Sequence, residues 1–110
     1  AIPEAYGGSG MGITEASLVL EEVAASGAAM NGATPLHLSM FGMEPVVKYG
    51  SEEMKQAYLP AVAAGELHVA FGVTEPDAGT DTTSITTAAR REGDEYIVKG
   101  RKVWTTKALQ

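Results

Sequence analysis

The sequence predicts an α+β fold, with a helical part first and antiparallel strands afterwards. Up to about residue 64, apolar side chains recur at helical spacing, and capping residues and glycines divide this part into three helices. After Gly65 the pattern changes to short runs rich in Val, Ile and Thr, with turn formers between them. This change in periodicity predicts two structural layers or two domains, joined near residues 64–68.

The first predicted helix covers about residues 14–26 and follows a Gly-rich loop. Thr14 is the expected N-cap, and Glu15 lies in the first turn, where the helix dipole favours a negative charge. Ser26 and Gly27 predict its end. The apolar residues at helical spacing are Ile13, Ala16, Leu20, Val23 and Ala24.

Two further helices are predicted before the periodicity changes. Residues 28–49 are apolar nearly all round, with Pro35 expected in the first turn and a kink at Pro45. Gly50 is expected just beyond this helix, and Ser51 is the expected N-cap of the next one. The predicted buried stripes are Leu36, Met40, Met43 and Val47 on the second helix, and Met54, Ala57, Tyr58 and Val62 on the third.

Short β-rich runs make up the second part of the chain. Strands are predicted over residues 68–74, 84–91, 96–99 and 102–106, with a turn at residues 92–95. Because the connections are short, antiparallel pairing is expected.

Composition excludes several classes of function. The 110 residues carry a net charge of −6 and no long Lys/Arg cluster, which argues against nucleic-acid binding. Without cysteine the chain has no disulfide, thiolate nucleophile or Cys-ligated metal. No apolar run reaches the roughly 18 residues of a membrane span, and no targeting segment is visible. Both ends are expected to be cuts through a longer protein.

The usual catalytic and metal-binding patterns are missing. Neither His37 nor His68 lies beside a nucleophile elbow, and no second ligand stands at metal spacing from His37, so a partly buried packing role is favoured for His37. Residues 7–10 (GGSG) precede a helix but lack the lysine of a phosphate-binding loop and follow no strand. An irregular connection is therefore favoured over a phosphate site.

Residues 72–84 (GVTEPDAGTDTTS) bring turn formers, hydroxyls and carboxylates together after an apolar run. Pro76 fixes φ and Gly79 permits a positive φ, so a sharp turn is expected. The carboxylates are candidates for acid–base chemistry, but the turn chemistry around them favours a structural role. They belong to Glu75, Asp77 and Asp81.

A second set of residues suits a ligand better. The hydroxyls of Thr74, Thr80, Thr105 and Thr106, with the ring of Trp104, fit a flat aromatic ligand with a polar edge. The alternative for Trp104 is plain core packing.

Residues 72–84 resemble the first signature of the acyl-CoA dehydrogenases, and residues 102–106 (KVWTT) resemble the second flavin-contacting strand of that family. Residues 3–8 (PEAYGG), 21–22 (EE) and 49–60 (YGSEEMKQAYLP) are also similar to it. The resemblance covers essentially all 110 residues in order. It departs at Thr80, where many members carry Ser, and at Lys107, where Asn or Ser is frequent.

The resemblance implies where a cofactor would bind. Residues 1–66 would belong to an N-terminal helical domain, and residues 67–110 would begin a β-barrel-like middle domain that holds FAD. Thr80 would also approach an acyl-CoA substrate near its thioester. The residues implied to bind FAD are Phe71, Val73, Thr74, Gly79, Thr80, Trp104, Thr105 and Thr106.

The implied reaction is α,β-dehydrogenation of an acyl-CoA thioester, with an electron-transfer flavoprotein as partner and a homotetramer as assembly. Its catalytic base would be a Glu outside this chain, so no catalytic residue is assigned here. The alternatives are an acyl-CoA oxidase or flavin monooxygenase of the same superfamily, or a truncated chain without activity. The expected location is the cytoplasm of a bacterium, which we favour, or the mitochondrial matrix of a eukaryote.

Overall fold

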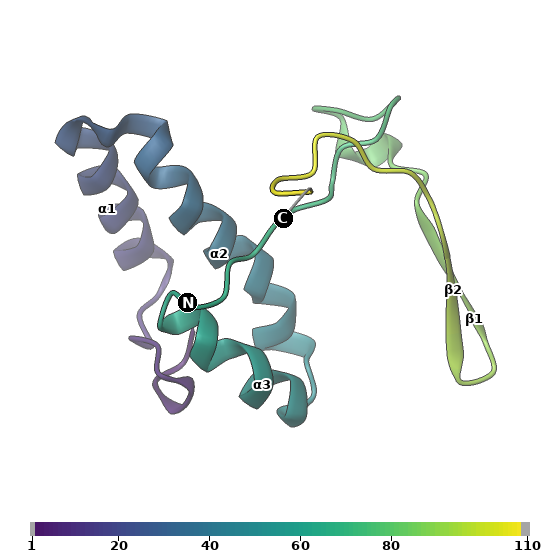
Figure 1. Ribbon diagram of the computed structural model, residues 1–110, viewed down its shortest axis with the longest axis horizontal. Helices are drawn as coiled ribbons and strands as arrows, with labels where there is room; N and C mark the ends of the chain where they lie inside the picture. Colours follow the sequence, from purple (N-terminus) through teal and green to yellow (C-terminus); the bar gives the residue numbers. More distant parts are fainter. Residues whose placement is uncertain (1, 109–110) are drawn as a thin grey trace. The chain divides into compact units, whose positions relative to one another are not determined.

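A computed structural model of the chain describes residues 2–108, and contacts between Cα atoms divide it into two compact units between Ala70 and Phe71 (Figure 1). The first unit contains a 3-10 turn and three α-helices, and the second contains a 3-10 turn and an antiparallel hairpin. This order confirms the predicted α+β class. The elements are the 3-10 turn Glu4–Tyr6, α1 (Ile13–Val23), α2 (Ala29–Tyr49), α3 (Glu52–Ala63), the 3-10 turn Thr82–Ser84, β1 (Ala88–Glu92) and β2 (Glu95–Lys99).

Helix α1 begins one residue earlier than predicted. Gly12 is the N-cap, and its N–H donates to Oε2 of Glu15 at 2.9 Å, so Thr14 is not the cap. The Glu15 carboxylate, at the third position of the helix, thus satisfies the backbone N–H of Gly12, which has no side chain of its own to cap the helix. The predicted stop is confirmed, because Gly27 has a φ of 94° and interrupts the helical path within the π turn Ala24–Ala28.

Helix α2 contains Pro35 and Pro45. Because it begins at Ala29, Pro35 lies beyond the first turn, and the prediction that placed it there is wrong. The first residue past α2 is Gly50, whose N–H donates to the Val46 carbonyl at 2.9 Å. Ser51 then caps α3 as predicted, with its Oγ accepting the N–H of Met54 at 3.2 Å.

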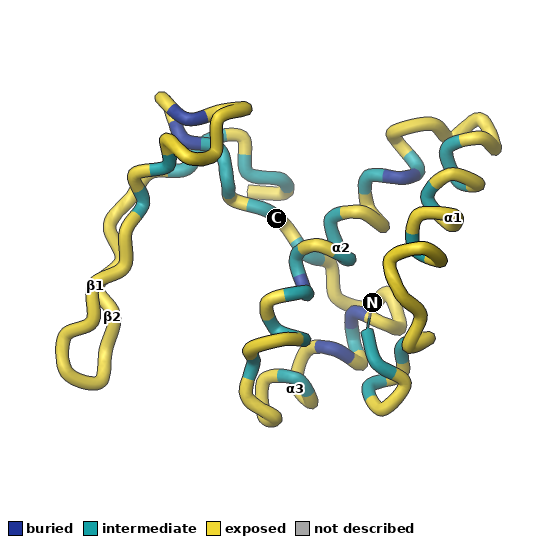
Figure 2. Tube along the Cα trace, turned by 180° about the vertical axis from the view of Figure 1, so that it is seen from behind, coloured by how far each residue is buried: buried dark blue, intermediate teal, exposed yellow. Residues whose placement is uncertain are grey.

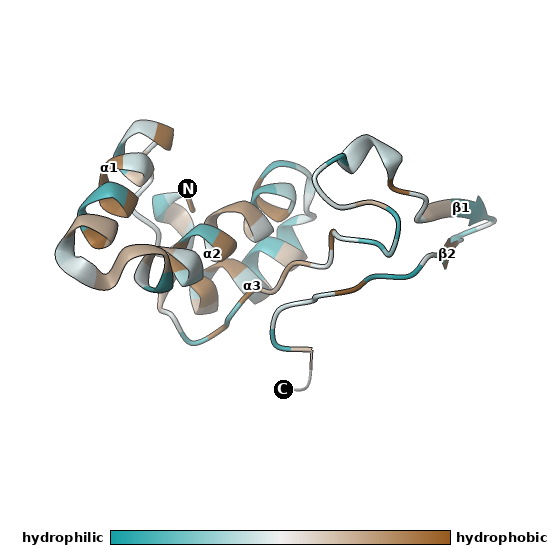
Figure 3. Ribbon diagram, turned by 90° about the horizontal axis from the view of Figure 1, so that it is seen from above, coloured by the Kyte–Doolittle hydropathy of each residue, from teal (hydrophilic) through white to brown (hydrophobic). Residues whose placement is uncertain are grey.

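The core of the helical unit is a cluster of Met43, Leu59 and Val62 at the α2–α3 contact, seen as dark blue segments in Figure 2. Leu59 has no exposed surface, whereas Met54 and Tyr58 remain 43% and 46% exposed. The predicted buried stripe on α3 is therefore right at Val62 but wrong at Met54 and Tyr58, and it missed Leu59. Apolar residues are spread along all three helices (Figure 3), so spacing alone does not mark which side of α3 is covered.

The hairpin of the second unit confirms the predicted turn. Ala88 pairs with Lys99 and Glu92 pairs with Glu95, and Gly93 turns the chain with a φ of 62°. The first strand starts at Ala88, four residues later than predicted. All residues of β1 and β2 are exposed, so neither face of this hairpin contributes to a core.

Two predicted strands are not formed within residues 2–108. Residues 68–74 and 102–106 have no strand ladder and share one backbone hydrogen bond, from the Val103 N–H to the Thr74 carbonyl at 2.9 Å. Val69 packs on the helical core instead of on a neighbouring strand. Trp104 has a φ of 58°, which breaks the extended path that a strand requires.

Candidate functional site

The second unit brings the two segments of the predicted site side by side. Besides the bond between Val103 and Thr74, the Lys102 Nζ donates to the Val73 carbonyl at 2.9 Å. A methyl group placed on Gly72 would lie 3.6 Å from Oγ1 of Thr105, which is ordinary van der Waals contact. Residues 29 positions apart in the chain are thus in direct contact.

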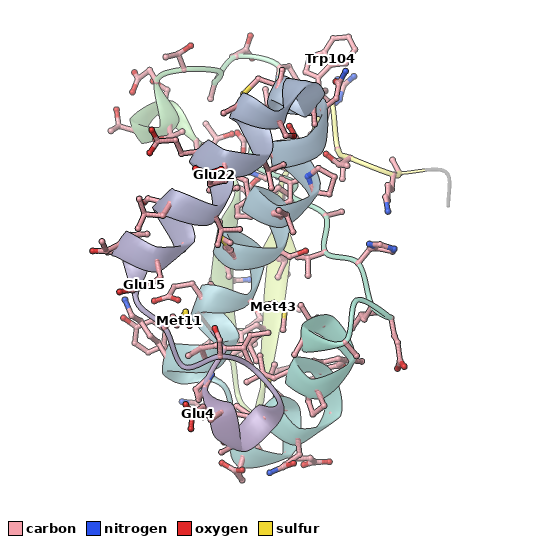
Figure 4. All side chains as sticks on the ribbon, turned by 90° about the vertical axis from the view of Figure 1, so that its left-hand side faces the viewer. Glu4, Met11, Glu15, Glu22, Met43 and Trp104 are labelled. Atoms are coloured by element: carbon pink, nitrogen blue, oxygen red, sulfur yellow. The ribbon has the colours of Figure 1, made fainter. Side chains whose placement is uncertain are left out.

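The indole of Trp104 is exposed. The residue is 90% accessible, and Figure 4 shows its side chain extending away from the backbone. Its φ of 58° and that of Lys107, 56°, place two non-glycine residues in the left-handed region on either side of Thr105 and Thr106. Trp104 therefore does not pack in a core of the described residues, and strained backbone of this kind is typical of ligand sites.

Glu75 is the buried charged residue of the described chain, with 5% of its surface exposed. Its Oε2 accepts the backbone N–H and the hydroxyl of Thr86 at 2.8 and 2.7 Å. Its Oε1 accepts the backbone N–H of Thr87 at 2.9 Å, the hydroxyl of Thr87, and the Lys102 Nζ at 3.0 Å. Three separate stretches of the second unit therefore meet at one carboxylate.

These donors make Glu75 a poor base. The Thr87 hydroxyl, followed by the amide and hydroxyl of Thr86, holds the pKa of the Glu75 carboxyl far below its ordinary value. Both oxygens are occupied, so a substrate proton has no free acceptor there. The structural role favoured from the sequence is confirmed for Glu75.

Asp81 also has a local role. Its Oδ1 accepts the N–H of Thr83 at 3.0 Å, and its Oδ2 accepts the hydroxyl of Ser84 at 2.6 Å. It thereby caps the 3-10 turn Thr82–Ser84, and the Ser84 hydroxyl is the largest cause of a lowered pKa at Asp81. The third carboxylate, Asp77, is exposed.

The sharp turn lies before Gly79. Glu75 and Ala78 exchange backbone hydrogen bonds at 2.9 and 3.2 Å, so Pro76 and Asp77 reverse the chain. Gly79 is not in the left-handed region, and a methyl group added to it would meet no atom within 4 Å. Its expected role in the turn is therefore wrong, and Gly79 and Thr80 instead form an exposed stretch after the turn.

The other motifs of the sequence have ordinary roles. His37 is exposed and lies with its ring 4.5 Å from that of Phe41, so the expectation of partial burial is wrong. In the GGSG loop, the amides of Gly8 and Gly10 donate to the Pro3 and Ile2 carbonyls, as in an irregular connection. Residues 2–108 hold no group of three side chains able to bind a metal ion, and none of their helices has the length and apolar character to cross a membrane.

Sequence patterns of one enzyme family match both parts of the chain. Residues 1–66 match the acyl-CoA dehydrogenase N-terminal domain, and residues 70–110 match the middle domain. The acyl-CoA dehydrogenase FadE12 of Mycobacterium tuberculosis is 43% identical over 109 residues, which cover 94% of this chain and 26% of that protein.

Solved structures agree with the sequence matches. A complex of glutaryl-coenzyme A dehydrogenase with glutaryl-CoA has a TM-score of 0.74 at 32% identity, over 99% of this chain and 28% of that one. A glutaryl-CoA dehydrogenase of Mycobacterium smegmatis in complex with FADH2 also has a TM-score of 0.74, at 34% identity, over 91% and 26%. A chain from a structure of the electron transferring flavoprotein of Acidaminococcus fermentans has a TM-score of 0.71 at 35% identity, over 94% and 27%.

The chain thus spans about a quarter of the length of the curated relatives it matches, since the shares of the first relatives lie at 25–28%. Within that quarter the match is nearly continuous, and it includes both segments of the candidate site. The chain belongs to the acyl-CoA dehydrogenase family.

Proposed function

We propose that the chain is part of an FAD-dependent acyl-CoA dehydrogenase that removes hydrogen from the α and β carbons of an acyl-CoA thioester. Because the chain spans about a quarter of its relatives, this activity belongs to a polypeptide of the relatives' length. Residues 1–66 are assigned to the N-terminal helical domain and residues 67–110 to the start of the middle domain.

The observation that carries the proposal is the contact between residues 71–74 and 102–106, the second of which carries the exposed Trp104. An aromatic face next to hydroxyls and backbone donors fits a flat ring with a polar edge, such as the isoalloxazine of FAD. When bound, FAD supplies the acceptor for hydride.

This chain's own residues have the task of holding and orienting. Phe71, Val73 and Thr74 are assigned to one segment against the ring, and Trp104, Thr105 and Thr106 to the other. Gly79 and Thr80 are assigned to the approach of the cofactor and of the thioester, and their exposure leaves them free for such a ligand. No base is assigned here, because the donors around Glu75 occupy both of its oxygens.

The partners follow from the same proposal. An acyl-CoA is the substrate, an electron-transfer flavoprotein takes the electrons, and the assembly is a homotetramer in fatty-acid metabolism. The proposed location is the cytoplasm of a bacterium, or the mitochondrial matrix if the source is eukaryotic. The glutaryl-CoA complex and the electron transferring flavoprotein structure among the neighbours support the first two assignments.

The test is spectroscopic. The 110-residue chain should retain FAD weakly or not at all, because it supplies one wall of the site, and a stoichiometric yellow complex would contradict this expectation. A polypeptide of the relatives' length should bind FAD and lose its flavin absorbance when an acyl-CoA is added without oxygen. Unchanged absorbance with every acyl-CoA tried would refute the activity, and rapid reoxidation by oxygen would identify an oxidase instead.

A further inference from the structure

We propose that Glu75 and Lys102 are positioning residues, which set the register between residues 71–74 and 102–106 and so place Thr105 beside the first segment. With Thr86 and Thr87 they form what we call the Glu75 clamp. The purpose of this register, to present one surface to a flavin, rests on the proposed function. The register itself can be tested without a flavin.

The clamp joins residues that the chain keeps far apart. Its donors to Glu75 lie 11, 12 and 27 residues further along. Two of them are backbone amides, whose positions fix the main chain at Thr86 and Thr87 as well as their side chains. Hydrogen bonds to an ionised acceptor are stronger than neutral ones, so this carboxylate can order three stretches of backbone together.

Lys102 connects the clamp to the two site segments. Its Nζ donates both to Oε1 of Glu75 and to the carbonyl of Val73, at 3.0 and 2.9 Å. The next residue, Val103, donates its N–H to Thr74. Two adjacent residues thus bind three consecutive ones, and a slip of one position would break every one of these bonds. Such a slip would also move Thr105 away from its place beside Gly72.

The hairpin is closed at the same place. Ala88 and Lys99 form the last pair of the β1–β2 ladder, and Thr87 and Gly100 are the residues just beyond it. A methyl group on Gly100 would lie 2.1 Å from Oγ1 of Thr87, so only a glycine lets these two residues approach this closely. The clamp therefore anchors both ends of the hairpin between the two site segments.

Few apolar side chains are buried where the two site segments meet. Among residues 71–108, only Glu75 and Ala78 are buried. The side chain of Lys102 is 27% exposed, against 59% for Lys48, which forms an ordinary ion pair with Glu44 on α2. The apolar residues of the two segments are at most half-buried, so we infer that the directional polar contacts set their register.

Two variants and one control test the inference in the 110-residue chain. Glu75→Gln keeps the shape of the side chain but places an NH2 group against backbone donors. Lys102→Met keeps the apolar stem and leaves the threonine contacts intact. Glu44→Gln makes the same chemical change in an ion pair whose N–O distance is also 3.0 Å. Hydrogen exchange of individual amides, followed by NMR, reports on each backbone bond.

For Lys102→Met we expect exchange of the Val103 amide to accelerate about tenfold, with little change at Thr86 and Thr87. For Glu75→Gln all three amides should accelerate, while Glu44→Gln should leave them unchanged. Unchanged Val103 exchange in Lys102→Met would overturn the inference. If Glu75→Gln loses all second-unit signals, the second unit has unfolded. Val103 exchange in Lys102→Met, which retains the carboxylate, then decides the inference.

A titration with FAD separates this inference from the proposed function. In the wild-type chain, millimolar FAD should shift the signals of the Trp104 indole N–H and of the Thr105 and Thr106 amides. In Lys102→Met these shifts should require about tenfold more FAD, whereas hairpin signals keep their wild-type positions. No shift in the wild-type chain would agree with the expected weak retention of FAD by one wall of the site; the flavin site is then tested by the polypeptide of the relatives' length, and the register by the Val103 exchange. Equal FAD titrations in both proteins would refute the positioning role.

Discussion

In the helical unit, Met43, Leu59 and Val62 form a buried apolar cluster, whereas residues 71–108 bury only Glu75 and Ala78. The first unit therefore owes its order to apolar area removed from water. The second owes its order to hydrogen bonds that converge on one carboxylate. The helical unit should therefore be more sensitive to a loss of core volume, and the second unit should be more sensitive to a loss of charge.

The largest expected effect is on the helical core. Leu59→Ala should lower the free energy of unfolding of the helical unit by about 2–5 kcal/mol, because Leu59 has no exposed surface and its removal leaves a cavity. Chemical denaturation followed by circular dichroism measures this loss. NMR signals of the β1–β2 hairpin should stay in place. Displacement of the hairpin signals in the folded variant would break the comparison, since it would make the two units depend on the same core.

A smaller effect is expected from a methyl group at the base of the hairpin. Gly100→Ala places a Cβ 2.1 Å from Oγ1 of Thr87 and should destabilise the second unit by about 1–3 kcal/mol. Gly65→Ala is a less crowded control, because its Cβ would meet nothing within 4 Å, although its φ of 76° makes it strained as well. Amide exchange at Thr86 and Thr87 should accelerate in Gly100→Ala alone, and equal acceleration in both variants would exclude the clash as the cause.

The sequence predicted the helical unit better than the second one, for a physical reason. Helix ends depend on local chemistry, and the Ser51 cap and the Gly27 stop could be recognised from neighbouring residues. The position of Leu59 at the centre of the core could not, because the covered side of α3 depends on where α2 and the N-terminal segment pack. Spacing showed only that α3 has apolar residues to bury.

The candidate site shows the same limit. The family resemblance implied that residues of both segments bind one FAD; the direct contacts between residues 71–74 and 102–106 were not predicted. The preference for a structural Glu75 came from its turn context and was right. The donors Thr86 and Thr87 and the role of Lys102 were missed, since no periodicity links a carboxylate to hydroxyls 11 or 12 residues away. Adjacent threonines before a β-strand were the available signal, but β propensity alone explains them.

The next smaller effect is that of low pH, which should destabilise the second unit more than the helical unit. The pKa of Glu75 is lowered from its ordinary value of 4.5, mainly by the Thr87 hydroxyl, and that of Asp81 is lowered from 3.8, mainly by the Ser84 hydroxyl. A lowered folded-state pKa means that the stabilisation is complete above the ordinary value and is lost as the pH falls below it towards the folded value.

Amide exchange at Thr86 and Thr87, corrected for the intrinsic pH dependence, should therefore become less protected as the pH falls below about 4.5. Glu75→Gln should remove most of this dependence. The helical unit should respond less, because its lowered carboxyl pKa values belong to Glu52, which is exposed, and to Glu44, whose side chain is 42% exposed. An equal loss of protection in α3 would show that charge matters as much there as in the clamp.

The smallest effect concerns a single helix cap, which tests whether polar contacts matter in the helical unit at all. Ser51→Ala removes the acceptor of the Met54 N–H and should cost about 1 kcal/mol, because water can replace the lost partner at this exposed end of α3. Ser51→Asp should restore most of the stability, since a carboxylate also accepts this bond and favours the positive end of the helix dipole. Thermal melts of the three proteins at neutral pH give the comparison. A loss as large as that of Leu59→Ala would mean that the helical unit, like the second one, depends on individual polar contacts more than on its apolar core.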